Sequence, residues 1–284
     1  MTDGETTPLH RAREMWALVE PLHDVTYFTP EARAAFEDVG LRGFWRGYFG
    51  GRAAPLGAVG PGLVTALFYG FAPDHVRRAL PDVWTRADPP TALAARTEGA
   101  RRAYERVLDG VPITGVLAAA EACEAAVARL DVGGRGLAAA NLDLPPVEEP
   151  YARLWQATTT LREHRGDGHV AMLVGYGVAG VEALVLRAGI DLRRPVLQPA
   201  RGWTDEQWDA AAASLVGRGL LDDQGRATDA GRTLMSRVEA HTDNVADMAW
   251  ADEAVTARVR ETMTPLAVRA RAVWPDWDPI GLPR

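Results

Sequence analysis

The sequence has no lysine, a single cysteine and fewer basic than acidic side chains, and each shortage excludes a class of protein. All 31 basic residues are arginine and the net charge is −7, which argues against general binding to a nucleic-acid backbone because no strong positive field is available. Cys123 alone can form neither an internal disulfide nor a cysteine-based zinc site. It lies in an alanine-rich run that predicts a buried thiol. The absence of lysine indicates a GC-rich source.

Targeting and membrane segments are also lacking. Residues 1–7 are polar and acidic and do not resemble a signal peptide. No apolar stretch reaches membrane-spanning length without a polar interruption. We therefore expect a soluble, cytoplasmic protein without a membrane partner. The sequence does not indicate an oligomeric state.

Helical periodicity dominates what is present. With 284 residues and 47% hydrophobic content, the chain can form one large domain or two of ordinary size. We predict an all-α protein of two related helical halves, residues 8–130 and 150–248. A linker rich in Gly and Pro joins them at 131–149, and a C-terminal helix with an extended tail follows at 249–284.

A Trp–Arg pair with a spacing of seven occurs once in each half. The first pair is Trp45 with Arg52, and the second is Trp155 with Arg162. Seven residues make two helical turns, so the two members of a pair share one helix face. If the halves arose by duplication, the two arginines approach each other across a pseudo-twofold axis, and superposing the halves aligns the pairs.

Residues 203–240 carry the clearest supersecondary pattern. Thr204 and Gln207 form a capping box ahead of a helix, and Gly219 ends that helix. Residues 220–228 then predict a short β-hairpin. The order of helix, short hairpin and Thr-Asx-Ala-Gly helix resembles the winged helix of MarR-type proteins. In such folds the helix before the hairpin enters the major groove of DNA.

The surface that would face DNA in such a fold has the wrong charge. Residues 191–201 also contain two prolines and show no clear first helix for the motif. A scaffold role is therefore favoured over DNA contact, although a basic stripe on residues 91–108 leaves a regulator open. The acidic residues of the expected DNA-contact surface are Asp205, Glu206, Asp209, Asp222 and Asp223, and its only basic residues are Arg218 and Arg226. The basic stripe consists of Arg96, Arg101, Arg102 and Arg106, with Glu98 and Glu105 between them.

Four segments elsewhere in the chain resemble the SalK-like proteins, an actinobacterial helix-turn-helix family often encoded beside specialised-metabolite genes. The segments are Val-Thr-Tyr-Phe with Pro-Glu at residues 25–31, Gly-Tyr-Phe at 47–49, Arg-Ala-Ala-Pro-Leu-Gly at 52–57, and Leu-Arg-Glu-His-Arg-Gly-Asp-Gly-His at 161–169. The resemblance implies a helical, winged-helix-like protein and brings no settled activity with it.

Residues 175–180, Gly-Tyr-Gly-Val-Ala-Gly, match the G-x-G-x-x-G motif. A dinucleotide site needs this motif directly after a strand, with an acidic ribose ligand at the end of the next strand. The segment that follows, residues 191–195, contains a proline and no usable strand. We expect the glycines to permit close helix packing and not to bind a nucleotide.

The stretch richest in polar chemistry is Arg-Glu-His-Arg-Gly-Asp-Gly-His at residues 162–169. Its two glycines predict a turn between two apolar helices, with Asp167 capping a helix that begins near His169. That helix N-terminus, with Arg162 and Arg165 beside it, predicts a site for a carboxylate or phosphate. The alternative is a capped turn whose arginines pair with neighbouring carboxylates.

His164 and His169 have two further interpretations. They are candidates for a general acid and base, or for metal ligands together with a carboxylate. A metal site needs a third ligand, for which His23 with Asp24 is the only candidate. We assign no residue to a metal, and no motif identifies a cofactor.

Aromatic residues crowd the segment from Tyr27 to Tyr69, and they could form the walls of a pocket. Tyr27, Tyr48 and Tyr69 are the informative members because a buried tyrosine hydroxyl needs a partner, and Arg52 lies among them. An apolar cavity with a few converging polar groups is typical of a small-molecule site. Aromatic residues at helical spacing also form ordinary cores.

These patterns favour a protein that binds a small, anionic or aromatic metabolite between its halves. Arg162, His164 and His169 are expected to face a cavity shared with Tyr48 or Arg52. The first alternative is a ligand-responsive transcriptional regulator, supported by the winged-helix pattern. The second is an enzyme of specialised metabolism that uses either histidine as a general base. No Ser-His-Asp order, phosphate loop or metal motif indicates a reaction class.

Overall fold

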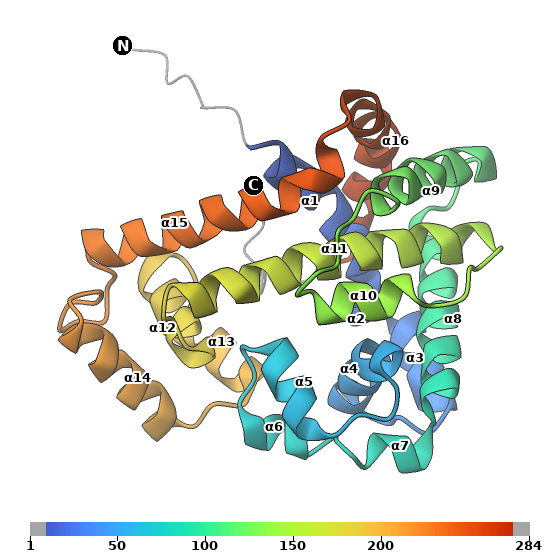
Figure 1. Cartoon of the computed structure of the whole chain (residues 1–284). Helices are drawn as coiled ribbons and strands as arrows, with labels where there is room; N and C mark the ends of the chain where they lie inside the picture. The colour runs from blue at the N-terminus through green and yellow to red at the C-terminus, as the bar shows by residue number, and fades with distance from the viewer. Residues whose placement is uncertain (1–9, 275–284) are drawn as a thin grey trace.

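The computed structural model describes residues 10–274 and confirms the all-α fold class (Figure 1). The predicted extended tail and the N-terminal segment before residue 10 lie outside the described residues. The helices of the first part are α1 (Arg11–His23), α2 (Val25–Phe28), α3 (Pro30–Asp38), α4 (Phe44–Ala53), η1 (Ala54–Leu56), α5 (Pro61–Phe68), α6 (Pro73–Arg77), α7 (Val83–Arg86), α8 (Pro89–Val107) and α9 (Ile113–Val127). They are followed by α10 (Gly136–Leu142), α11 (Pro150–Gly175), α12 (Gly180–Ile190), α13 (Arg194–Arg201), α14 (Asp205–Gly217), α15 (Asp229–Ala246), η2 (Asp247–Trp250) and α16 (Glu253–Arg271).

Helix α11 runs through the middle of the molecule (Figure 1). It packs against α1, α8 and α9 from the first half, against α10, and against α15. Its 26 residues are buried on most sides, which is why its sequence shows no single apolar face. The predicted linker at 131–149 contains α10, which also packs on α11. The central core is therefore shared between segments far apart in the sequence.

The predicted turn at residues 162–169 is wrong, because this stretch lies inside α11. A Cβ on Gly168 would stand 2.6 Å from Nη1 of Arg135, so the missing side chain makes room for that guanidinium. Arg135 donates hydrogen bonds to the carbonyls of His164 and Val245 and thereby links α11 to α15. Glycine inside a helix costs about 1 kcal/mol relative to alanine, and the packing gained around α11 outweighs that cost.

Helices α12, α13 and α14 form a separate cluster at one end of the molecule (Figure 1). The expectation that residues 191–201 lack a helix is wrong. Pro195 lies in the first turn of α13, where its missing N–H is not needed, and Pro199 lies in its second half. Gly202 ends α13 with φ +74°, a left-handed conformation that suits glycine, and Thr204 caps α14. The pair α13–α14 is thus a helix-turn-helix.

The predicted β-hairpin at residues 220–228 is reduced to one antiparallel bridge between Leu221 and Ala227. The side chain of Asp222 accepts hydrogen bonds from the amides of Gln224 and Arg226, which tightens the turn. Thr228 already caps α15, so too few residues remain for ladder pairing. The described part of the chain contains no strand.

Of the three glycines in the G-x-G-x-x-G motif, only Gly180 serves packing as predicted, because a Cβ on Gly175 or Gly177 would meet no atom within 4 Å. The motif follows α11, not a strand, and opens α12. A Cβ on Gly180 would lie 2.0 Å from the carbonyl oxygen of Tyr69, so only glycine fits this approach. The hydroxyl of Tyr69 donates to the carbonyl of Val178, 2.7 Å away. Tyr69 therefore joins α5 to the start of α12.

Two further sequence expectations concern the core and the membrane. Cys123 is buried as predicted, and burial raises the pKa of its thiol to about 12. Within residues 10–274, no single helix is long and apolar enough to cross a bilayer. The bent pair α11 and α12 meets that test only jointly, by length and composition, with an angle of 95° between its helices.

Candidate functional site

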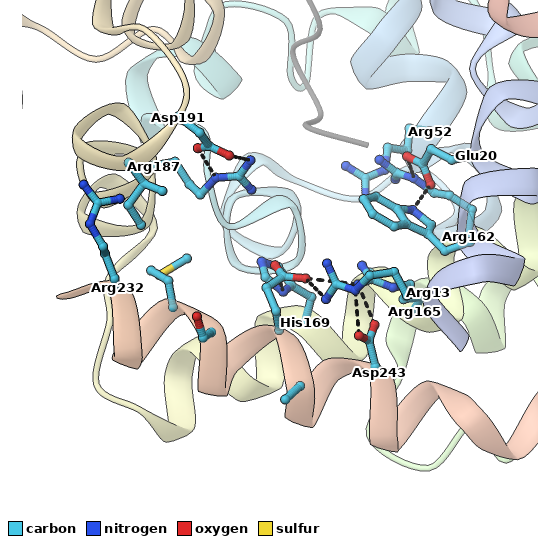
Figure 2. Close-up of a pocket in the computed structure, with 17 residues that line it drawn as sticks. Arg13, Glu20, Arg52, Arg162, Arg165, His169, Arg187, Asp191, Arg232 and Asp243 are labelled. Carbon is cyan, nitrogen blue, oxygen red and sulfur yellow. Dashed lines mark hydrogen bonds and ion pairs between the residues drawn. The ribbon is translucent and has the colours of Figure 1, made fainter. Parts of the chain in front are cut away.

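A cavity with a volume of about 720 Å³ lies among α1, α11, α15 and the end of α12 (Figure 2). Each long helix presents one face to it, because the lining residues recur at spacings of three or four. We call it the arginine pocket. Its charged and titratable side chains are Arg13, Glu20, Arg52, Arg162, Arg165, His169, Arg187, Asp191, Arg232, Glu239 and Asp243.

On the α15 side, two arginines share two carboxylates. Arg13 donates to Glu239 and Asp243 at 2.7 Å each. Arg165 donates to the same pair at 3.2 and 3.0 Å, and its guanidinium carbon lies 4.1 Å from the ring centre of Trp16. Burial acts to raise the pKa of Glu239, but neighbouring His169, Arg165 and Arg13 lower it to about 2. Both carboxylates and both guanidiniums are therefore held in fixed positions.

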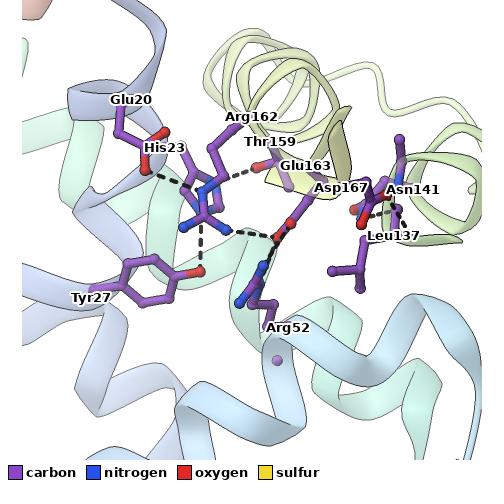
Figure 3. A network of polar contacts seen from close by, with 12 residues as sticks. Glu20, His23, Tyr27, Arg52, Leu137, Asn141, Thr159, Arg162, Glu163 and Asp167 are labelled. Carbon is purple, nitrogen blue, oxygen red and sulfur yellow. Dashed lines mark hydrogen bonds and ion pairs between the residues drawn. The ribbon is translucent and has the colours of Figure 1, made fainter. Parts of the chain in front are cut away.

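On the α4 side, Arg52 and Arg162 meet at the carboxylate of Glu163 (Figure 3). Arg52 binds both oxygens of Glu163 at 2.8 Å, and Arg162 donates to one of them at 3.2 Å. Arg162 also donates to Glu20 at 3.1 Å. Burial works against the charge of Glu163, whose side chain is 1% exposed, but the two guanidiniums hold its pKa below the usual value. The two arginines therefore lie close together at Glu163, while the duplication and its pseudo-twofold axis stay predictions.

Tyr27 and Tyr48 lie behind this ion pair. Arg52 donates to the hydroxyl of Tyr48 at 3.2 Å, and the hydroxyl of Tyr27 is 3.0 Å from Nε2 of His23. The two tyrosine rings are 5.0 Å apart. Nδ1 of His23 contacts the hydroxyl of Thr159 at 2.9 Å. Tyr48 thus orients Arg52 from the core, Tyr27 contacts His23, and neither tyrosine lines the arginine pocket.

The two candidate histidines have different surroundings. His169 lines the arginine pocket, with Nδ1 3.1 Å from the hydroxyl of Thr242 and 3.7 Å from Glu239. Burial lowers its pKa, so the imidazole is neutral near pH 7. His164 does not line the arginine pocket; its Nε2 lies 3.2 Å from the carbonyl of Asp131. Burial lowers the pKa of His164 to about 4.

The metal interpretation of these histidines finds no support in the described residues. That part of the chain contains no group of three or more His, Cys, Asp or Glu side chains that could hold a metal ion. His23, the suggested third ligand, is instead stacked on Trp155 with ring centres 5.9 Å apart.

Asp167 and Tyr69 do not contribute to the pocket. Asp167 does not cap a helix at His169 as predicted, since α11 continues through both residues. Its carboxylate instead accepts the amides of Leu137 and Ala138 at 2.9 Å and caps α10 (Figure 3). Burial raises the pKa of Asp167 to about 6. Tyr69 makes the interhelix bond described above, outside the arginine pocket.

Several pocket residues escaped the sequence interpretation. Arg13, Trp16 and Glu20 stand at i, i+3 and i+7 on α1, and a search for polar stripes at helical spacing would have found them. The same spacing relates Arg232 to Glu239 on α15. Arg201, which does not line the arginine pocket, has no such signal either. It ends α13 with its guanidinium 4.6 Å from the ring centre of Phe71 and makes no ion pair within the described residues.

The pocket has a surplus of positive charge in an acidic protein. Its wall contains six arginines and four carboxylates. Glu163 behind the wall adds one negative charge. Arg201 offsets it, and burial together with the charges of Arg52 and Arg162 lowers the pKa of Arg201. The pocket region therefore has two more positive than negative charges, whereas the whole chain has a net charge of −7.

The outer face of the helix-turn-helix has no such surplus. Arg194 pairs with Asp205 and Asp209 at 2.8 and 2.7 Å. The two arginines expected to help DNA binding are occupied as well, since Arg218 pairs with Glu182 at 3.0 Å and Arg226 with Asp222 at 2.9 Å. The helix-turn-helix thus presents mostly acidic and small side chains.

The basic stripe on α8 is a solvated face of local ion pairs with one exception. Arg101 and Arg102 both pair with Glu98, and Arg106 pairs with Glu31. Arg96 does not belong to the stripe: it is 3% exposed and donates to Asn141 and Gln156 at 3.0 Å and to the carbonyl of Gly51. It lies in the core because α8 packs on α11.

Comparison with known proteins agrees with this architecture. Residues 12–274 match the model of a helix-turn-helix family. The chain belongs to this family. No curated protein and no solved structure matches the chain. The matched residues include both the helix-turn-helix and the residues that line the arginine pocket.

Proposed function

We propose that this helix-turn-helix protein binds a small anionic metabolite in the arginine pocket. The supporting observation is the surplus of guanidinium groups in a cavity of about 720 Å³, within the size range of about 300–1,000 Å³ typical of small-molecule sites. A carboxylate or phosphate would complete the charge balance, and arginine forks match both groups in geometry.

Unused hydrogen-bond donors in the pocket indicate how an anion would be held. Each guanidinium has five N–H donors. Within the described residues, Arg162 uses Nε and Nη1 and Arg165 uses only Nη2, while Arg232 makes no hydrogen bond or ion pair. The ion pairs with Glu20, Glu163 and Asp243 fix the first two arginines in advance, so binding would cost little ordering entropy.

Native mass spectrometry of the purified protein tests this proposal. We expect a small adduct that is released on denaturation and carries a carboxylate or phosphate. Arg162→Ala should weaken its affinity by about 2–4 kcal/mol, because one partner of a desolvated ion pair is removed. Arg33→Ala is the matched control, since Arg33 is exposed and pairs only with Glu37. Equal binding by both variants, or no binding of any carboxylate or phosphate, would exclude the arginine pocket as the site.

A ligand-responsive regulator is the second candidate, favoured by the helix-turn-helix and by the family. The paired arginines and acidic side chains of the outer face argue against it. We therefore expect no tight duplex binding at physiological salt, because phosphate contacts supply most of such affinity. A gel-shift or fluorescence titration against the neighbouring promoter decides the matter. Sub-micromolar, sequence-dependent binding to this DNA would favour the regulator as the function of the protein.

An enzyme is a third candidate, and its general base would be His169 alone. His169 combines a neutral imidazole with a carboxylate 3.7 Å away in a pocket wall, whereas His164 is remote from that pocket. For a ligand recovered by mass spectrometry, His169→Gln would abolish turnover and leave binding if the residue is a base. A contact residue would instead weaken binding.

A further inference from the structure

A second cavity lies where the helix-turn-helix meets the first half of the chain, and the arginine pocket does not explain it. It has a volume of about 630 Å³ and no lining residue in common with the arginine pocket. Its wall comes from the start of α4, from α6 and the residues after it, and from the turn between α13 and α14. These segments lie next to one another at the lower edge of the view in Figure 1. We call it the turn pocket.

Positive charge lines the turn pocket without an opposing carboxylate in its wall. The charged side chains are Arg42, Arg46 and Arg78. Arg46 is engaged by Asp82 at 3.2 Å, a residue outside the wall. Among the described residues, Arg42 and Arg78 form no ion pair, and both are exposed. Two guanidiniums therefore remain available to an anion that enters the pocket.

A buried and unpartnered histidine forms part of the same wall. His75 is 7% exposed, and neither of its ring nitrogens has a hydrogen-bond partner among the described residues. The ring fits against the turn because Gly202 has no side chain; a Cβ there would lie 2.4 Å from the Cβ of His75. Burial and the charge of Arg78 lower the pKa of His75, so its neutral imidazole can donate one hydrogen bond and accept another. A buried polar group without a partner is destabilising, and a ligand that supplies the partner removes that penalty.

Aromatic rings complete the turn pocket. Trp45 and Trp203 line it together with Phe44, which is 41% exposed. The ring of Trp45 stands edge-on to Phe44 and to His75, with ring centres 4.8 and 4.5 Å apart. The Trp203 indole is fixed because its N–H donates to the carbonyl of Gly70 at 2.9 Å. Fixed aromatic faces beside free cations suit a flat ring that bears negative charge.

We propose that the turn pocket is a separate binding site for a small planar aromatic molecule carrying a carboxylate or a phosphate. The anionic group contacts Arg42 and Arg78, the ring stacks among the aromatic side chains, and His75 contributes a hydrogen bond. A pocket of this volume matches one ring system better than an extended strand of nucleic acid. Because the wall includes Gly202 and Trp203, an occupied site ties the helix-turn-helix to α4 and α6.

Isothermal titration calorimetry with named probes tests the proposal. We expect saturable binding of 2-naphthoate or 2-naphthyl phosphate, and much weaker binding of 2-naphthylmethanol and of inorganic phosphate. The first comparison shows which anionic group is preferred, and the last two show that ring and charge are both required. Tighter binding of oligothymidylate than of either aryl anion would overturn the proposal in favour of single-stranded nucleic acid. No saturable binding of either aryl anion would also overturn it.

Variants locate the bound probe. Arg42→Gln and Arg78→Gln should each weaken binding about fivefold, the upper range for an exposed charge pair. Arg77→Gln is the matched control, because Arg77 is the adjacent residue, is exposed, pairs with Asp74 and does not line the turn pocket. Arg162→Ala in the arginine pocket should leave the affinity unchanged. Equal effects of Arg77→Gln and Arg78→Gln, or loss of binding in Arg162→Ala, would contradict the assignment.

His75→Phe separates the hydrogen bond from the packing. Phenylalanine keeps an aromatic ring against Trp45 and removes both ring nitrogens. We expect a loss of affinity for the probe, with an unfolding midpoint at least as high as that of the original protein because the unpartnered ring nitrogens are removed. Unchanged affinity in a folded variant would exclude His75 from the site.

Discussion

The arginine pocket and the turn pocket are both cationic cavities between helices, but they differ in whether carboxylates in the pocket wall neutralise their guanidiniums. In the arginine pocket most guanidiniums bind a carboxylate of the protein, as Arg52 binds Glu163 and Arg13 binds Asp243. In the turn pocket no carboxylate lines the wall. The difference follows from depth: Glu163 and Asp243 are almost fully buried, and a buried guanidinium needs either a counter-charge or, like that of Arg96, several hydrogen bonds.

This comparison separates two uses of arginine. The paired network stabilises the fold and presents a few spare donors in fixed positions. The exposed arginines of the turn pocket contribute little to the fold and keep their charge for a partner. We therefore expect substitutions in the two pockets to differ in their effects on stability.

Removing the shared carboxylate should have the largest effect. Glu163→Gln leaves the buried guanidiniums of Arg52 and Arg162 without their common counter-charge, and we expect a loss of about 3–5 kcal/mol in the free energy of unfolding. Urea denaturation measures it. Glu98→Gln is the control, because this exposed carboxylate also serves two arginines and should cost less than about 1 kcal/mol. If both variants lost a similarly small free energy of unfolding, the buried ion pairs of the arginine pocket would not stabilise the fold more than exposed ones do.

The second-largest effect is expected at acidic pH, where the ion pairs of the arginine pocket should contribute less to the free energy of unfolding. Because neighbouring charges lower the pKa of Glu239 from 4.5 to about 2, its contribution to stability is complete above pH 4.5 and is lost as the pH falls towards 2. The shift corresponds to about 3 kcal/mol. We expect the urea midpoint of Glu239→Gln to fall less steeply than that of the original protein as the pH is lowered from 4.5 towards 2. Parallel pH profiles would show that Glu239 has the same pKa in the folded and unfolded chains.

The smallest effect belongs to the turn pocket. Arg42→Gln and Arg78→Gln should each change the free energy of unfolding by less than about 0.5 kcal/mol, as expected for exposed side chains without fixed partners. The same urea titrations measure them beside Glu163→Gln. A loss of several kcal/mol in either variant would mean that these arginines support the fold, and the contrast between the pockets would fail.

Part of this architecture could be predicted because it depends on local signals. The capping box at Thr204, the proline at the start of α3 and the end of α14 near Gly219 are encoded within a few residues. The pocket face of α11 was also partly foreseen: Arg162, Arg165 and His169 line the same cavity as Arg52. His164 was misplaced because a continuous helix points it to the opposite side, towards Asp131.

Other errors arose where local preference and tertiary packing disagree. Gly166 and Gly168 favour a turn in isolation, but α11 continues through them because its neighbours enclose it on most sides. Two prolines argued against α13, although a short helix with Pro195 in its first turn loses few hydrogen bonds. Leu221 and Ala227 pair only once because Thr228 already caps the next helix.

By itself the sequence determined the helical class, the capping box at Thr204 and the shared face of Arg162, Arg165 and His169, since these rest on interactions between residues at most four apart. Only the tertiary structure decided which carboxylate each arginine meets. The partners Arg52 and Glu163 are 111 residues apart, and Arg13 and Asp243 are 230 apart. These two pairs form because packing brings both groups within hydrogen-bond distance and removes the carboxylates from water. The same packing leaves Arg42 and Arg78 without partners beside the buried ring of His75.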